Sequence, residues 1–128
     1  MFRRGKSEAP RRERQGLVSN ILLQRGDVPG DRLAITWVDV APGSRQTPHR
    51  HAPEQVYVII KGKGLMRVGK EEQDVSAGDL VWIPPNVIHG IENRSSDVLS
   101  YISAATPAFD LEALYDTGEL RTGPKRSR

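Results

Sequence analysis

Between residues 33 and 104, apolar residues fall into short segments that end at glycine, proline or polar residues. β-Branched and aromatic residues are common in these segments, which is typical of strands rather than of helices. We expect strands at residues 33–40, 56–60, 65–68, 73–75, 79–83, 89–93 and 98–104. Because they are short and regularly spaced, they favour an all-β sandwich or barrel over a fold of alternating strands and helices.

Residues 109–118 have a helical pattern instead. Leu111, Leu114 and Tyr115 would share one helical face, and Gly118 would end the helix. The sequence therefore predicts an all-β domain followed by a short C-terminal helix.

The charged residues are unevenly distributed along the chain. The formal net charge is +3, but residues 1–14 hold six basic residues and residues 121–128 hold four. Residues 15–120 hold nine basic and fourteen acidic residues, a net charge of about −5. A nucleic-acid-binding domain would carry its positive charge on a folded face, so we expect no specific nucleic-acid binding.

These observations suggest three regions. We expect a basic, disordered N-terminal arm at residues 1–16, one domain at residues 17–118 and a basic tail at residues 119–128. No apolar run approaches the length of a membrane span, and the basic N-terminus lacks the apolar segment of a signal peptide. We therefore expect a cytoplasmic protein without a membrane segment.

The chain has three histidines, and two of them, His49 and His51, are separated by one residue. On an extended segment these two rings point to the same face. Glu54 and Gln55 follow. Because neighbouring residues on a strand point to opposite faces, only one of these two side chains can point toward the histidines. The chain has no cysteine, so a metal would have to bind to histidine, amide or carboxylate groups.

Two spaced motifs resemble those of the cupin family. The first is Gly43-x5-His49-x-His51-x3-Gln55-x6-Gly62, and the second is Gly78-x5-Pro84-x-Asn86-x2-His89-x3-Asn93. Glutamine replaces the usual glutamate of the first motif, and asparagine replaces a glycine of the second. The 15 residues between the motifs are similar to the spacing in compact single-domain cupins.

The resemblance implies a small antiparallel β-barrel of jelly-roll type, a double-stranded β-helix, with a divalent metal inside. It implies that His49, His51 and His89 are metal ligands and that Gln55 occupies the fourth ligand position. A three-histidine site with Gln55 as a hydrogen-bonding neighbour is the alternative. Glu54 falls outside the motif spacing and would face away from Gln55.

Three aromatic residues are further candidates for a role near the site. Tyr57 shares the face of Gln55 and is a candidate for the substrate pocket, although a core position explains it equally well. Trp37 and Trp82 are expected to serve in packing rather than in stacking on a substrate.

The proposed ligands suit manganese, iron, nickel, cobalt or zinc. Four protein ligands would complete the tetrahedral coordination of zinc, whereas a six-coordinate ion would keep two open positions. Manganese and iron are therefore favoured. Because histidine binds metals only when neutral, its ordinary pKa of about 6.5 predicts metal loss at roughly pH 5–6.

Two functions agree with such a site. The first is a metalloenzyme for a small anionic substrate, a carboxylate beside a keto, hydroxyl or enol group, and a sugar acid is one example. Cupins host isomerases, lyases, decarboxylases and dioxygenases, and the resemblance does not choose among them. The second is a non-catalytic binding or sensor module. The sequence favours the enzyme, and the resemblance implies a homodimer that pairs through sheet edges.

Overall fold

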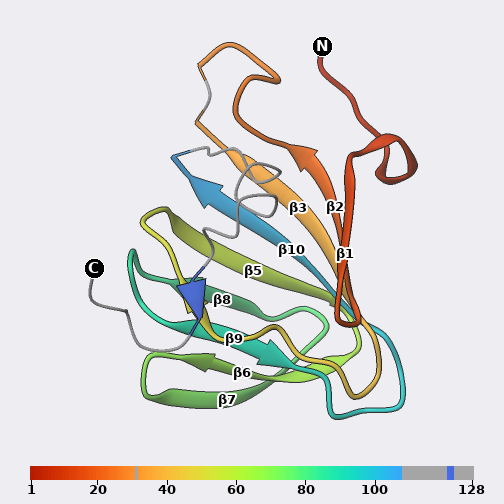
Figure 1. The fold of residues 1–128 in the computed structure, drawn as a ribbon, viewed down its shortest axis with the longest axis vertical. Helices are drawn as coiled ribbons and strands as arrows, with labels where there is room; N and C mark the ends of the chain where they lie inside the picture. The colour runs from red at the N-terminus through yellow and green to blue at the C-terminus, as the bar shows by residue number, and fades with distance from the viewer. Residues whose placement is uncertain (31, 108–120, 123–128) are drawn as a thin grey trace.

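The computed structural model describes residues 1–30, 32–107 and 121–122 of the 128-residue chain. Strands dominate the described residues (Figure 1). The elements are η1 (Lys6–Glu8), β1 (Arg11–Arg14), β2 (Leu17–Leu23), β3 (Ala34–Val40), β4 (His49–Arg50), β5 (Glu54–Lys61), β6 (Lys63–Val68), β7 (Glu71–Ser76), β8 (Leu80–Ile83), β9 (His89–Glu92), β10 (Leu99–Thr106) and β11 (Arg121–Thr122). None of the described residues belongs to a helix with the length and apolar character needed to cross a membrane.

The strands form two antiparallel sheets. Sheet A has the order β1-β2-β3-β10-β5-β8, and sheet B has the order β11-β4-β9-β6-β7. In Figure 1, sheet A extends from β1 to β8, and β6, β7 and β9 of sheet B lie below it. Strands far apart in the sequence pair in sheet A, where β10 lies between β3 and β5. This arrangement confirms the predicted all-β fold of jelly-roll type.

The barrel interior is filled by alternate residues of the strands, as the period of two in a strand requires. On β3, buried residues alternate with partly exposed ones from Ala34 to Val40. The buried apolar cluster draws on both sheets and contains Val38, Val40, Tyr57, Ile59, Met66, Val75, Ile83, Ile91, Leu99 and Tyr101. Both sheets therefore contribute their inner faces to one core.

Two turn residues adopt backbone conformations that restrict which side chains can stand there. Gly62, between β5 and β6, has φ +79°, and a Cβ atom there would lie 2.5 Å from the Val98 carbonyl oxygen. Asn86 has φ +63°, a left-handed conformation that asparagine tolerates better than most residues. Its backbone N–H donates to the His51 carbonyl at 2.8 Å. The turn before β9 is thus bonded to the segment that carries the first two histidines.

The N-terminal region differs from the expectation of disorder. Strand β1 pairs with β2, Arg4 contacts Asp27 at 2.9 Å and Lys6 contacts Asp39 at 2.9 Å. The charge of residues 1–16 alone could not predict these contacts, because the acidic partners lie 23 and 33 residues further along the chain. It also missed β2, whose buried residues include polar ones.

The C-terminal expectations fall mostly on residues that the structure does not describe. The helix predicted at residues 109–118 lies outside the described residues. Of the predicted tail at residues 119–128, only residues 121–122 are described, and they form β11, paired with β4.

Candidate metal centre

The fold brings all three histidines together inside the barrel. His49 on β4 lies directly opposite His89, the first residue of β9, and His51 follows β4. The ring centroids of His49 and His89 are 4.5 Å apart, and that of His51 lies 5.0 Å from His89 and 5.7 Å from His49. One nitrogen from each ring can be chosen so that all lie within 4.8 Å of one another. This spacing suits three ligands of one metal ion.

Hydrogen bonds to backbone carbonyls select the same tautomer in all three histidine rings. Each Nδ1 lies near a carbonyl oxygen two residues away, and the partners are Thr47 O (3.0 Å from His49), Pro53 O (3.0 Å from His51) and Val87 O (2.9 Å from His89). Because a carbonyl oxygen can only accept, each Nδ1 must carry a proton and donate it. In the neutral rings the lone pairs are therefore on Nε2, where a metal can bind.

The Nε2 atom of His89 supports the presence of a cation. His89 is 1% exposed, and within the part of the chain that the structure describes its Nε2 has no hydrogen-bond partner. A buried acceptor without a partner costs about 1–3 kcal/mol. A bound metal ion would remove that cost, so the residues present fit the metal that the motifs imply.

Gln55 supplies an oxygen beside these nitrogens. Its side chain is buried, and its Oε1 lies 2.9 Å from His51 Nε2, while its amide N–H donates to Ser103 Oγ on β10. His51 donates from Nδ1, so its neutral ring has no proton for this second contact, and two acceptors face each other. A shared cation resolves the conflict, because adjacent ligands about 2.1 Å from an octahedral ion lie ~3.0 Å apart.

Glu54 lies on the other face of β5, as the alternation of the strand predicts. It is exposed, and the indole N–H of Trp82 donates to its Oε2 at 2.7 Å. Trp82 is itself 54% exposed rather than packed inside. Trp37 is half-buried and donates to Asp39 at 3.0 Å. The residue near the histidines is therefore Gln55, and the acidic neighbour belongs to the outer surface.

Burial keeps the histidines in their metal-binding form. Loss of hydration on burial is the main cause that lowers the pKa of His49 from 6.5 to about 4 and that of His89 to about 3, and repulsion between the charged rings contributes to both shifts. Burial also lowers the pKa of His51. At neutral pH all three rings are uncharged, and their Nε2 lone pairs are available.

Tyr57 borders the histidine cluster from inside the core. Its ring centroid lies 6.0 Å from that of His89 and 4.2 Å from that of Tyr101, on which it stacks. Its hydroxyl donates to Gln46 Oε1 at 2.8 Å. The roles of Gln46 and Ser103 could not be predicted from the sequence, because a polar side chain carries no local signal of the distant residue that it meets.

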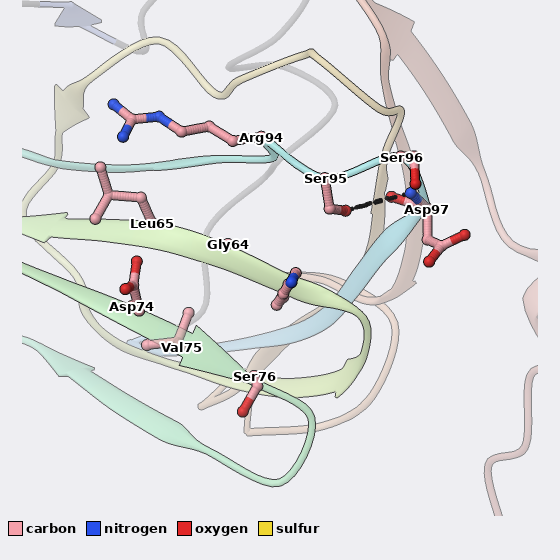
Figure 2. Close-up of a pocket in the computed structure, with 10 residues that line it drawn as sticks. Gly64, Leu65, Asp74, Val75, Ser76, Arg94, Ser95, Ser96 and Asp97 are labelled. Carbon is pink, nitrogen blue, oxygen red and sulfur yellow. Dashed lines mark hydrogen bonds between the residues drawn. The ribbon is translucent and has the colours of Figure 1, made fainter.

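A separate pocket of about 560 Å³ lies elsewhere, on β6, β7 and the loop after β9 (Figure 2). Arg94, Asp74 and Asp97 give its lining both signs of charge, and Figure 2 shows Ser95 bonded to Asp97 at the rim. Neither the three histidines nor Gln55 is among its lining residues. Among the residues that the structure describes, the three histidines are the group of side chains placed to hold a metal ion, so we assign the chemistry to them.

Together, a jelly-roll barrel and a buried histidine cluster define a class of small metal-binding β-proteins. The chain belongs to the cupin family, whose cupin domain matches residues 36–105. It is 30% identical, over 100 residues, to an uncharacterised protein of Methanocaldococcus jannaschii, a match that covers 77% of this chain and 80% of that protein.

Two solved structures illustrate the same fold. The polyketide cyclase RemF from Streptomyces resistomycificus has a TM-score of 0.72 and 19% identity, covering 84% of this chain and 80% of that one. A predicted oxalate decarboxylase from Thermotoga maritima has a TM-score of 0.73 and 20% identity, covering 83% of this chain and 98% of that one. At these identities the likeness concerns the fold.

Proposed function

We propose that this protein is a metal-dependent enzyme that acts on a small, oxygen-rich anion. The observation that carries the proposal is the set of four converging neutral donors, the Nε2 atoms of His49, His51 and His89 and the Oε1 atom of Gln55. Neutral ligands leave a divalent ion its full formal charge of +2. Such a site attracts an anion more strongly than one with a carboxylate ligand.

Manganese or iron suits this donor set best. Both ions accept imidazole nitrogen and amide oxygen, and a six-coordinate ion held by four protein groups has two positions left for substrate. Two such positions fit a carboxylate beside a keto, hydroxyl or enol oxygen, and a sugar acid is one member of this class. When bound, the metal supplies Lewis-acid polarisation of the substrate oxygen.

The protein groups contribute orientation and exclusion of water. The carbonyl partners fix the histidine rings, and Ser103 fixes the amide of Gln55 with its oxygen toward His51. Tyr57, stacked on Tyr101 beside His89, is proposed as part of the pocket wall. Two proteins of similar structure are a polyketide cyclase and a predicted oxalate decarboxylase, so lyase, decarboxylase, isomerase and dioxygenase chemistry are the reactions to assay.

Elemental analysis of protein purified without chelators is the first test. We expect close to one equivalent of manganese or iron per chain. Calorimetric titration with oxalate, a keto acid and a sugar acid should then show binding that requires the metal. Metal-free protein that binds these anions equally well would contradict the proposal.

A binding or sensor module is the second candidate. In the described ranges, the cluster of potential metal ligands contains three histidines and no carboxylate, so it offers no acidic group for proton transfer. Incubation of the metal-loaded protein with each bound anion separates the two functions. Unchanged anion after prolonged incubation would favour the sensor, and conversion that scales with metal content would favour the enzyme.

We also propose a cytoplasmic homodimer. For the dimer, the supporting observation is the exposure of three large apolar side chains on β5 and β8, those of Ile60, Leu80 and Trp82.

A further inference from the structure

Two hydroxyl groups lie beside the proposed metal ligand Gln55 inside the barrel. Ser103 on β10 pairs directly with Thr36 on β3, and both side chains belong to the buried, inner face of sheet A. Side chains of directly paired residues have their Cβ atoms about 4.5–5.5 Å apart. Because Ser103 Oγ accepts the amide N–H of Gln55, a row of polar groups runs from Gln55 through Ser103 to Thr36.

The two hydroxyls have protons that the protein does not use. Ser103 Oγ acts as an acceptor toward Gln55, so its own O–H can still donate. Within the described part of the chain, the Thr36 side chain has no hydrogen-bond partner. Even a bond between the two hydroxyls would use only one of their two protons. At least one buried donor is therefore directed at a group that the protein itself does not supply.

The surroundings of these hydroxyls are uncharged. Among the described residues, the buried polar side chains are those of serine, threonine, asparagine, glutamine and histidine, and none is lysine, arginine, aspartate or glutamate. Arg50 lies between His49 and His51 but points to the opposite face of its strand. Arg67 is exposed and donates to the Gly69 carbonyl at 3.1 Å. A second carboxylate on a ligand would thus lose its water without gaining a buried cationic side chain.

We propose that Thr36 and Ser103 bind a hydroxyl group of the substrate, which is a carboxylate that carries further hydroxyl groups and no second charge. This inference rests on the proposed function, because it requires a metal site that binds a carboxylate. In a 2,3-dihydroxy acid such as glycerate, the carboxylate and the 2-hydroxyl form the chelating end, and the 3-hydroxyl is left for the protein. Thr36 is then a specificity-determining residue that does not hold the metal.

Three acids with the same chelating end test the proposal. Glycerate, lactate and malate are all 2-hydroxy carboxylates, and the group on their C2 atom is hydroxymethyl, methyl and carboxymethyl, respectively. We expect calorimetric titration of the manganese-loaded parent to show that the preferred enantiomer of glycerate binds about fivefold more tightly than either enantiomer of lactate, the effect of about one net hydrogen bond. Malate should also bind more weakly than glycerate, because its second carboxylate has no cationic partner.

Changes at Thr36 test which residue provides this preference. Thr36→Val removes the hydroxyl and keeps the branched shape, so it should weaken glycerate binding about fivefold and leave lactate binding within about twofold of the parent. Thr36→Ser keeps a hydroxyl and should keep the preference for glycerate. Thr106→Val, the same substitution at an exposed residue of β10, is the control and should match the parent. A Thr36→Val protein that prefers glycerate as strongly as the parent would overturn the proposal.

The same titrations separate this inference from the proposed function. If the parent binds lactate as tightly as glycerate, or binds malate most tightly, the inference is wrong and the proposed function stands. If the metal-loaded parent binds none of the three acids, both are wrong. Thr36→Val should hold as much manganese as the parent and give the same circular dichroism spectrum, because Thr36 is not a proposed ligand. Should Thr36→Val misfold, Thr36→Ala must show the same loss of preference. Ser103 is kept unchanged here, because its hydroxyl also fixes the amide of Gln55.

Discussion

The two halves of the barrel interior lie on the same strands but differ in character. On β3, β10 and β5 one half presents Val38, Tyr101 and Ile59, whereas the other presents Thr36, Ser103 and Gln55, all buried. The apolar half gains stability from every side chain that it removes from water. The polar half holds histidines that burial keeps uncharged and an Nε2 atom without a partner. Stability is therefore supplied by one half, and the other half is arranged for binding.

The comparison predicts the largest loss of stability for a change in the apolar half. Leu99 is fully buried in the core, so Leu99→Ala should lower the free energy of unfolding by about 2–5 kcal/mol. Leu33→Ala, at a residue that is 50% exposed, is the control and should cost much less. Urea denaturation of the metal-free proteins measures both. Metal affinity of folded Leu99→Ala should equal that of the parent, and a large loss of affinity would show that the two halves are coupled.

In the polar half, the largest effect should come from removing a proposed ligand. His89→Ala should weaken metal binding by more than about 100-fold, since changes to outer partners alone cost 10–100-fold. Competition with a metal-sensitive dye measures this affinity. If His89→Ala binds metal as tightly as the parent, the assignment of the site is wrong.

The two halves should also differ in their response to pH. The pKa values of His49 and His89 are lowered in the folded protein, so between pH 6.5 and about 4 the unfolded chain binds more protons. The stability of the metal-free protein should therefore fall as pH falls through this window, by up to about 1.4 kcal/mol per pH unit for each histidine. Urea denaturation at several pH values measures the slope, and His89→Ala should reduce it.

The same burial changes the expectation for metal loss. The ordinary histidine pKa predicts release at pH 5–6, but protons compete with metal only when they can bind to the buried rings. With pKa values of about 4 and 3 for His49 and His89, we expect release below pH 5. Release of the metal already at pH 6 would contradict the lowered pKa values of His49 and His89.

The sequence predicted the barrel and the histidine positions because both depend on local signals. Alternation and turn residues mark strands such as β3 and β5, and motif spacing marks His49, His51 and His89. Ser103 was missed because it meets Gln55 only through the pairing of β10 with β5, 48 residues apart. The pairing of β1 was missed for the same reason, since its stability depends on contacts that charge composition does not reveal.

Gln55→Glu sharpens the comparison by adding a charge to the polar half. The site charge with a divalent ion would fall from +2 to +1, and unit charges about 4 Å apart interact by about 4 kcal/mol at an effective dielectric of 20, before desolvation offsets part of it. We expect the variant to bind bare metal at least as tightly and to bind oxalate more weakly. Glu54→Gln, on the outer surface, should change neither affinity. Calorimetry on both variants tests this, and a weaker metal site in Glu54→Gln would identify Glu54 as the ligand.

Ser103→Ala should give the smallest change, about tenfold weaker metal binding. Without the hydroxyl, the buried amide N–H of Gln55 loses its acceptor. Rotation of the amide would then direct this N–H toward His51 Nε2 and satisfy both groups without metal, so the rotated state competes with binding. Ser103→Thr keeps a hydroxyl and should bind metal like the parent. In a Gln55→Glu background, where both carboxylate oxygens accept, Ser103→Ala should have little effect. An equal loss in both backgrounds would show that Ser103 supports the strand rather than the orientation of the amide.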